Sequence, residues 1–129
     1  MAQDLVLAST NAGKLAELAD LLDGRYRVLA RPDDLADTVE DGDTLEANAI
    51  KKAREVSAHS GSDALSDDTG LFVDALDGRP GVRTARFAGP DATDADNRAK
   101  LLDELTPWPE PAGRAARFRT VVALVRTDG

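Results

Sequence analysis

A six-residue polar segment, Ser9–Lys14, separates an apolar run from an amphipathic stretch and ends on a lysine. Backbone N–H groups at the start of a helix bind anions such as phosphate, and the helix dipole and the lysine add positive charge there. The segment is not a P-loop, because that motif needs glycine at position 8 and Ser or Thr at position 15, where this chain has Ala8 and Leu15. A capped helix with a surface lysine is the alternative. The residues of the expected anion site are Ser9, Thr10, Asn11, Ala12, Gly13 and Lys14.

An acidic pair, Asp67 and Asp68, lies within Ser66–Gly70, between two short apolar runs. Adjacent carboxylates repel each other unless a cation or a proton lies between them. Mg²⁺ binds a few carboxylates together with water and substrate phosphates, and a carboxylate beside such a metal can act as general base toward water. Asp and Gly are also common in solvated turns. Ligands of open α/β sheets bind at strand ends, however, which favours a functional pair here.

Two weaker candidates lie before and within a helix that we expect from Thr44 to about Ser60. An acidic loop before this helix could complete the metal site with one carboxylate, although a solvated loop is the alternative for most of its residues. Asn48 and Lys52 are four residues apart and share one helix face, from which Lys52 could reach a phosphate. A solvated face is the alternative for this pair. The acidic residues of the loop are Asp37, Glu40, Asp41 and Asp43.

The charge balance excludes one class of partner. The chain has 129 residues, 24 acidic and 16 basic, and a net charge of −8, so we expect no nucleic-acid partner, which would need clustered Lys and Arg. Four arginines in or after the long loop could bind anions or form salt bridges, and their spacing fits no nucleic-acid motif. They are Arg79, Arg83, Arg86 and Arg98.

The composition excludes several further classes of protein and of site. The chain has no cysteine and one histidine, which excludes a disulfide framework, a cysteine nucleophile and a histidine-rich zinc site. No apolar run reaches the ~20 residues that span a bilayer, so we expect no membrane partner. The first residues lack the basic and long apolar segments of a signal peptide, and we expect a cytoplasmic protein.

The apolar pattern predicts the elements that must position these side chains. Alternation of strand and helix patterns along the first half favours an α/β fold. The acidic pair is expected in a turn between two strands. The expected strands are 5–8, 27–30, 63–66, 71–73 and 117–126, and the expected helices are 15–22, 44–60 and one that Thr93 caps and Pro107 ends.

These segments together closely resemble the inosine triphosphate pyrophosphatase family, whose members are also described as dITP/XTP pyrophosphatases. The match follows the same order and spacing over nearly the whole chain. It consists of a strand with Ser9-Thr10-Asn11-x-x-Lys14, a helix with Asn48-x-x-x-Lys52, Ser66-Asp67-Asp68-Thr69-Gly70-Leu71, Pro80-Gly81 through Arg86-Phe87-Ala88-Gly89, and Asp91 through Asn97.

The resemblance implies a Mg²⁺-dependent enzyme that hydrolyses non-standard purine nucleoside triphosphates (ITP, dITP and XTP) to the monophosphate and pyrophosphate. Such an enzyme removes these nucleotides from the nucleotide pool. The implied fold is α/β, with a long, bent mixed sheet flanked by helices, and the implied assembly is a homodimer.

The resemblance also implies roles for individual residues. Glu40 and Asp68 would hold Mg²⁺, and Asp68 would be the base that activates the water attacking the α-phosphorus. Asp67 is a further candidate ligand from the acidic pair itself. The residues implied to contact substrate phosphates are Asn11, Lys14, Thr69 and, as a weaker candidate, Lys52.

The chain departs from the family pattern in its later part. Family members carry a Gly-Phe-Gly-Tyr-Asp-Pro segment and a Ser-His-Arg segment that contribute to base recognition, and neither occurs in these residues. We therefore expect residues 1–129 to form a single α/β domain, the N-terminal portion of a longer family domain. One alternative is a chain that binds nucleotide or metal without turnover. Another is a signalling receiver domain, whose acidic pair would follow the first strand.

Overall fold

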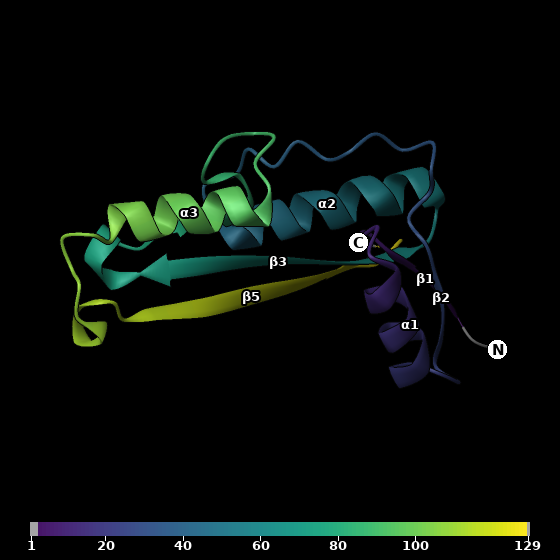
Figure 1. The fold of residues 1–129 in the computed structure, drawn as a ribbon. Coiled ribbons are helices and arrows are strands. Elements are labelled where there is room, and N and C mark those ends of the chain that lie inside the picture. The colour runs from purple at the N-terminus through teal and green to yellow at the C-terminus, as the bar shows by residue number, and fades with distance from the viewer. Residues whose placement is uncertain (1–2, 129) are drawn as a thin grey trace. The chain divides into compact units, whose positions relative to one another are not determined.

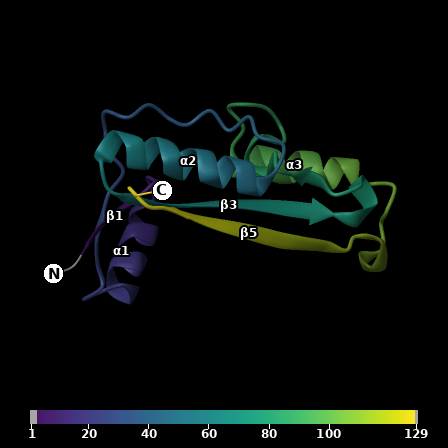
Figure 2. The same cartoon turned by 180° about the vertical axis from the view of Figure 1, so that it is seen from behind.

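The computed structural model describes residues 3–128, which form an α/β fold (Figures 1 and 2). Its strands are β1 (Gln3–Leu7), β2 (Tyr26–Leu29), β3 (Asp63–Val73), β4 (Arg79–Gly81) and β5 (Ala116–Val125). Its α-helices are α1 (Ala12–Leu21), α2 (Leu45–Ser60) and α3 (Asp94–Glu104), and short 3₁₀ turns span Asp74–Leu76, Thr84–Arg86 and Pro111–Gly113. None of the helices between residues 3 and 128 combines the length and apolar character needed to cross a membrane.

The strands form one mixed sheet in the order β2-β1-β3-β4, with β5 also paired to β3. β1 is parallel to both of its neighbours, with Leu5 opposite Val28 on one side and Asp63 on the other. Parallel neighbours need crossover connections, and α1 and α2 supply them in chain order. β3 and β4 are antiparallel, with Phe72 opposite Pro80. The expected mixed α/β sheet is therefore confirmed.

Contacts divide the described residues into two compact units. The first unit contains the residues up to Asp68 and those from Val121 onward, and the second is Thr69–Thr120. In the first unit α2 and α1 lie on opposite faces of the sheet (Figures 1 and 2). The core residues of the first unit are Val6, Ala8, Ala49, Ala53, Val56, Ala64 and Ala123. Those of the second are Val73, Leu76 and Leu105.

The ends of α2, expected at Thr44 and at about Ser60, are set by two local signals. The Thr44 side chain accepts a hydrogen bond from the Ala47 N–H at 3.0 Å and caps the first turn. Gly61 ends the helix in the left-handed conformation, with φ of 70°, and donates its N–H to the Ser57 carbonyl. These ends fix which residues of α2 face the sheet and the preceding loop.

β3 runs without interruption through the acidic pair, so the prediction of a turn between two strands is wrong. Pairing with β1 at one end, β4 at the other and β5 keeps the whole segment extended. Gly70 marks a close backbone contact, because a Cβ there would lie 2.6 Å from the Gly81 carbonyl oxygen. The glycine that suggested a turn is therefore required by the close approach of strand β4.

Replacing Gly61 by alanine should lower the free energy of unfolding by about 1 kcal/mol, because an L-residue is disfavoured in the left-handed region. A Cβ at this position would meet nothing within 4 Å, so the cost comes from backbone strain alone. Gly61→Asn is the matched control, since asparagine tolerates this conformation, and it should lose less. Urea denaturation measures all three proteins. An alanine variant as stable as the wild type would contradict the assignment of Gly61 as the helix end.

Candidate functional site

The turn between β1 and α1 is organised by Asn11, the N-cap residue of α1. Asn11 Oδ1 accepts hydrogen bonds from the backbone N–H groups of Gly13 and Lys14, at 2.9 and 3.2 Å. The Asn11 N–H in turn donates to Ser9 Oγ at 3.0 Å. All residues in the first turn of α1 are among those that the structure describes, and none of them is acidic. The positive end of the helix dipole is therefore not cancelled within that turn. The turn is thus an ordered, electropositive helix start.

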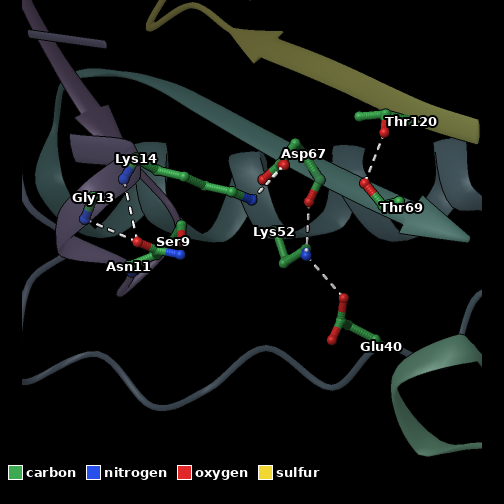
Figure 3. Close-up of polar contacts among 9 residues, drawn as sticks. All are labelled: Ser9, Asn11, Gly13, Lys14, Glu40, Lys52, Asp67, Thr69 and Thr120. Atoms are coloured by element: carbon green, nitrogen blue, oxygen red, sulfur yellow. Dashed lines mark hydrogen bonds and ion pairs between the residues drawn. The ribbon is translucent and has the colours of Figure 1, made fainter. Parts of the chain in front are cut away.

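Lys14 reaches from α1 to β3 and pairs with Asp67. Lys14 Nζ lies 2.6 Å from Asp67 Oδ2, and the two side chains are 44 and 27% exposed. Partly exposed ion pairs contribute about 0–1 kcal/mol, so this contact orients the lysine without holding it tightly. The pair places a predicted phosphate-binding lysine against a predicted metal ligand (Figure 3).

Lys52 is more buried than Lys14, with 20% of its side chain exposed, and it joins the loop before α2 to β3. Its Nζ lies 2.9 Å from Glu40 Oε1 and donates a hydrogen bond to the Asp67 carbonyl oxygen at 3.0 Å. Both lysines therefore meet at Asp67, one at its carboxylate and the other at its carbonyl (Figure 3). The four-residue spacing of Asn48 and Lys52 was the sequence signal for this helix face.

The loop that carries Glu40 is attached to α2 by further polar contacts. Asn48 is 1% exposed, and its Oδ1 accepts a hydrogen bond from the Gly42 N–H at 2.8 Å. Lys51 pairs with Asp41 at 3.0 Å, and this hydrogen bond holds the pKa of the Asp41 carboxyl below its usual value. The first half of α2 thus determines where Glu40 lies.

Two other contacts of this loop had no sequence signal. Arg31 is 9% exposed and donates to the carbonyls of Ala8 and Ala36, at 3.2 and 2.6 Å. It links the end of β1, next to the anion-binding turn, to the loop. His59 Nε2 lies 2.9 Å from Asp34 Oδ1, which holds the pKa of the Asp34 carboxyl below its usual value. Chain order alone does not reveal which carbonyl or carboxylate such side chains meet.

The acidic pair is split by the geometry of β3. Successive side chains on a strand leave opposite faces of the sheet. Ala64, which packs in the core with α2, shares its face with Ser66 and Asp68, and Asp68 Oδ2 is buried there. Asp67 leaves the other face, toward Lys14. The strand therefore separates the two carboxylates that an acidic turn would have brought together.

Residues 3–128 contain no group of three or more His, Cys, Asp or Glu side chains arranged to hold a metal ion. A divalent cation at this place would therefore take its remaining ligands from water and from substrate phosphates, as Mg²⁺ commonly does. Glu40 is connected to β3 through Lys52, and Asp68 lies on the α2 face of the same strand.

Thr69 belongs to the second unit, where its hydroxyl is oriented by Thr120. The two Oγ1 atoms lie 2.8 Å apart. Thr84 Oγ1 accepts a hydrogen bond from the Leu71 N–H at 2.8 Å and donates to the Gly81 carbonyl at 2.5 Å. Thr84 lies in the segment 80–89, which is part of the family resemblance. The contact of Thr120 with Thr69 joins residues 51 positions apart, and no sequence pattern predicted it.

A hollow of about 230 Å³ lies beside Lys14 and Asp67 in the first unit. Its walls are mostly apolar, with Leu18 of α1 and Leu65 of β3 among them. Ser66 is also among the lining residues. The charged groups of the pair thus border apolar surface, where electrostatic interactions are stronger than in bulk water.

Residues 5–129 match the Ham1 family. A dITP/XTP pyrophosphatase of Geobacter sulfurreducens is 48% identical over 128 residues, which cover 97% of this chain and 64% of that protein. A dITP/XTP pyrophosphatase of Xanthomonas axonopodis is 48% identical to this chain, and the matched residues cover 63% of that protein. A HAM1 protein structure from Coxiella burnetii superimposes with a TM-score of 0.87 at 40% identity, covering 98% of this chain and 64% of that one. The chain thus spans a little under two thirds of these relatives, and it belongs to the Ham1 family.

Proposed function

We propose that the chain carries the phosphate- and metal-binding part of a pyrophosphatase that hydrolyses ITP, dITP and XTP to the monophosphate and pyrophosphate. The observation that carries this proposal is the meeting of two lysines at Asp67. Preorganised cations stabilise the charge that spreads over phosphate oxygens during an in-line displacement. Relatives named dITP/XTP pyrophosphatase support the substrate class.

The β1–α1 turn and the two lysines would bind the triphosphate. Lys14 and Lys52 supply full positive charges, and the Asn11 cap keeps the turn ordered beside them. Thr69 joins this set through the family resemblance. The proposed substrate-binding residues are Ser9, Thr10, Asn11, Ala12, Gly13, Lys14, Lys52 and Thr69.

The oxygen atoms around Asp67 have the chemistry that a hard divalent cation requires. The Lys52 ammonium already lies between Glu40 Oε1 and the Asp67 carbonyl oxygen, so these donors surround a positive charge. We propose that Glu40 and Asp68 hold Mg²⁺, with Asp67 as a further ligand once Lys14 has released its carboxylate, and the bound ion would neutralise charge on the triphosphate. Glu40 and Asp68 are the stronger pair, because the Asp67 carboxylate leaves the other face of β3 and orients Lys14.

Each proposed phosphate-binding lysine is paired with a proposed metal ligand, Lys14 with Asp67 and Lys52 with Glu40. Substrate binding would exchange these partners, so that the lysines turn to phosphate oxygens and the carboxylates to the cation. The exchange is inexpensive, because partly exposed ion pairs contribute only about 0–1 kcal/mol each, whereas charge-assisted hydrogen bonds contribute about 1.5–3 kcal/mol.

Asp68 would act as the general base. Its carboxylate would accept a proton from a water molecule as the water oxygen attacks the α-phosphorus. The bond from the α-phosphorus to its bridging oxygen would break, and pyrophosphate would leave with the electron pair. The buried position of Asp68 Oδ2 supports this role, because burial removes solvating water from the oxygen that would accept the proton.

Asp68→Asn should lower kcat for ITP hydrolysis by about 10²–10⁴-fold, because the amide cannot accept the proton. Asp67→Asn is the matched control on the opposite face of the strand, and it should act mainly on KM by releasing Lys14. Pyrophosphate release in the presence of Mg²⁺ gives both constants. Full activity of Asp68→Asn would show that another group is the base.

Lys52→Met should weaken the affinity for ITP by about 10–100-fold, the loss expected when one charge-assisted hydrogen bond is removed. Lys51→Met is the control, because Lys51 precedes it on α2 and also contacts the loop but pairs with Asp41. Calorimetric titration with ITP and Mg²⁺ compares the two variants. Equal losses would assign the effect to loop attachment and contradict a phosphate contact of Lys52.

The second candidate function is nucleotide or metal binding without turnover, because the two lysines at Asp67 would bind phosphate whether or not Asp68 acts as a base. Heat of ITP binding without pyrophosphate release from the 129-residue chain would favour it. The homodimer, the cytoplasmic location and the single-domain organisation stay predictions.

A further inference from the structure

A second hollow, of about 350 Å³, lies within the unit Thr69–Thr120 and gathers basic side chains from β4, the following 3₁₀ turn and α3. This unit has eight basic and eight acidic residues. None of the described residues that line the hollow is acidic. Charges of one sign are therefore segregated here. The residues that define this basic hollow are Arg79, Arg83, Arg86, Phe87 and Lys100.

Two of these cations are held in place by other groups. Lys100 Nζ donates a hydrogen bond to the Phe87 carbonyl at 2.8 Å and lies 4.5 Å from the centre of the Phe87 ring. Arg79 Nη2 lies 2.9 Å from Glu104 Oε1 of α3. The Arg79 side chain remains 56% exposed, so its guanidinium has further donors for a ligand.

The loop that carries Arg83 and Arg86 is also fixed. The Arg83 N–H donates to the Pro80 carbonyl at 3.0 Å, and the Arg86 N–H donates to the Arg83 carbonyl at 2.9 Å. Thr84 ties this loop to β3 through the Leu71 N–H. Residues three apart in a 3₁₀ turn lie above one another, which brings the two arginines to the same side. Cations on a fixed loop lose little freedom when they bind a ligand.

We propose that the basic hollow binds a di- or triphosphate group, either as free pyrophosphate or on a nucleotide. Like charges in one hollow repel each other, and a multivalent anion removes this cost. Guanidinium groups also match phosphate oxygens with paired hydrogen bonds. The site shares no residue with the proposed catalytic set, so it does not depend on the proposed function.

The test is a calorimetric titration of the 129-residue chain with pyrophosphate in EDTA, on a Lys14→Ala background that weakens the β1–α1 site. Arg83→Gln with Lys100→Gln should weaken binding at least about a hundredfold, as expected for the loss of two charge-assisted hydrogen bonds. Arg98→Gln with Arg117→Gln removes the same charge outside the hollow and should change affinity by less than about twofold. Circular dichroism confirms that both variants fold.

A parallel titration with ITP distinguishes the two sources of the phosphate group. Equal loss with pyrophosphate and ITP supports the shared phosphate chemistry, and a loss with ITP alone supports a nucleotide ligand. Equal affinity of the two double variants would overturn the proposal. It would also be overturned if sulfate at the same ionic strength displaced pyrophosphate equally well, because the hollow would then act only through general screening.

Discussion

The Lys52 ammonium, held between Glu40 and the carbonyl of Asp67, is the contact on which the candidate site depends. It attaches the irregular loop before α2 to the middle of β3, and nothing in the loop's own pattern would place Glu40 there. The caps at Thr44 and Gly61 set the ends of α2 and so the direction of this lysine. The local signals that end α2 therefore also determine the position of a carboxylate outside the helix.

The distribution of charge along the chain explains how this contact can be part of a phosphate-binding site. Thr69–Thr120 is electrically balanced, so the net charge of −8 lies in the remainder of the chain, which has sixteen acidic and eight basic residues. An uncomplexed triphosphate would meet a repulsive field there. A triphosphate that shares its charge with a divalent cation meets carboxylates that can bind the cation and lysines that can bind the phosphates. The acidic composition and the phosphate-binding role are therefore compatible.

Local signals made much of the fold predictable. Thr44 and Thr93, which were expected to begin helices, are the N-cap residues of α2 and α3, and each acts within a few residues of its own position. The continuity of β3 was not predictable, because pairing with three other strands outweighs the turn preference of Asp and Gly.

The candidate site was predictable as a set of residues but not as an arrangement. Lys14 and Asp67 were each singled out, yet their ion pair joins positions 53 residues apart. The alternation of side chains on β3, which separates Asp67 from Asp68, follows only once the segment is known to be a strand. The contacts of Arg31 could not be predicted from the sequence, because its partners are backbone carbonyls, which every residue carries.

The exchange of lysine and carboxylate partners is the central claim, and it predicts that cation and triphosphate bind cooperatively. The most direct measurement is the affinity for a non-hydrolysable ITP analogue, determined by calorimetry with Mg²⁺ and again with EDTA. The affinity should be at least about tenfold higher with Mg²⁺, a coupling of roughly 1.4 kcal/mol. Equal affinity in the two conditions would show that the carboxylates do not share the ligand with a cation and would contradict the account.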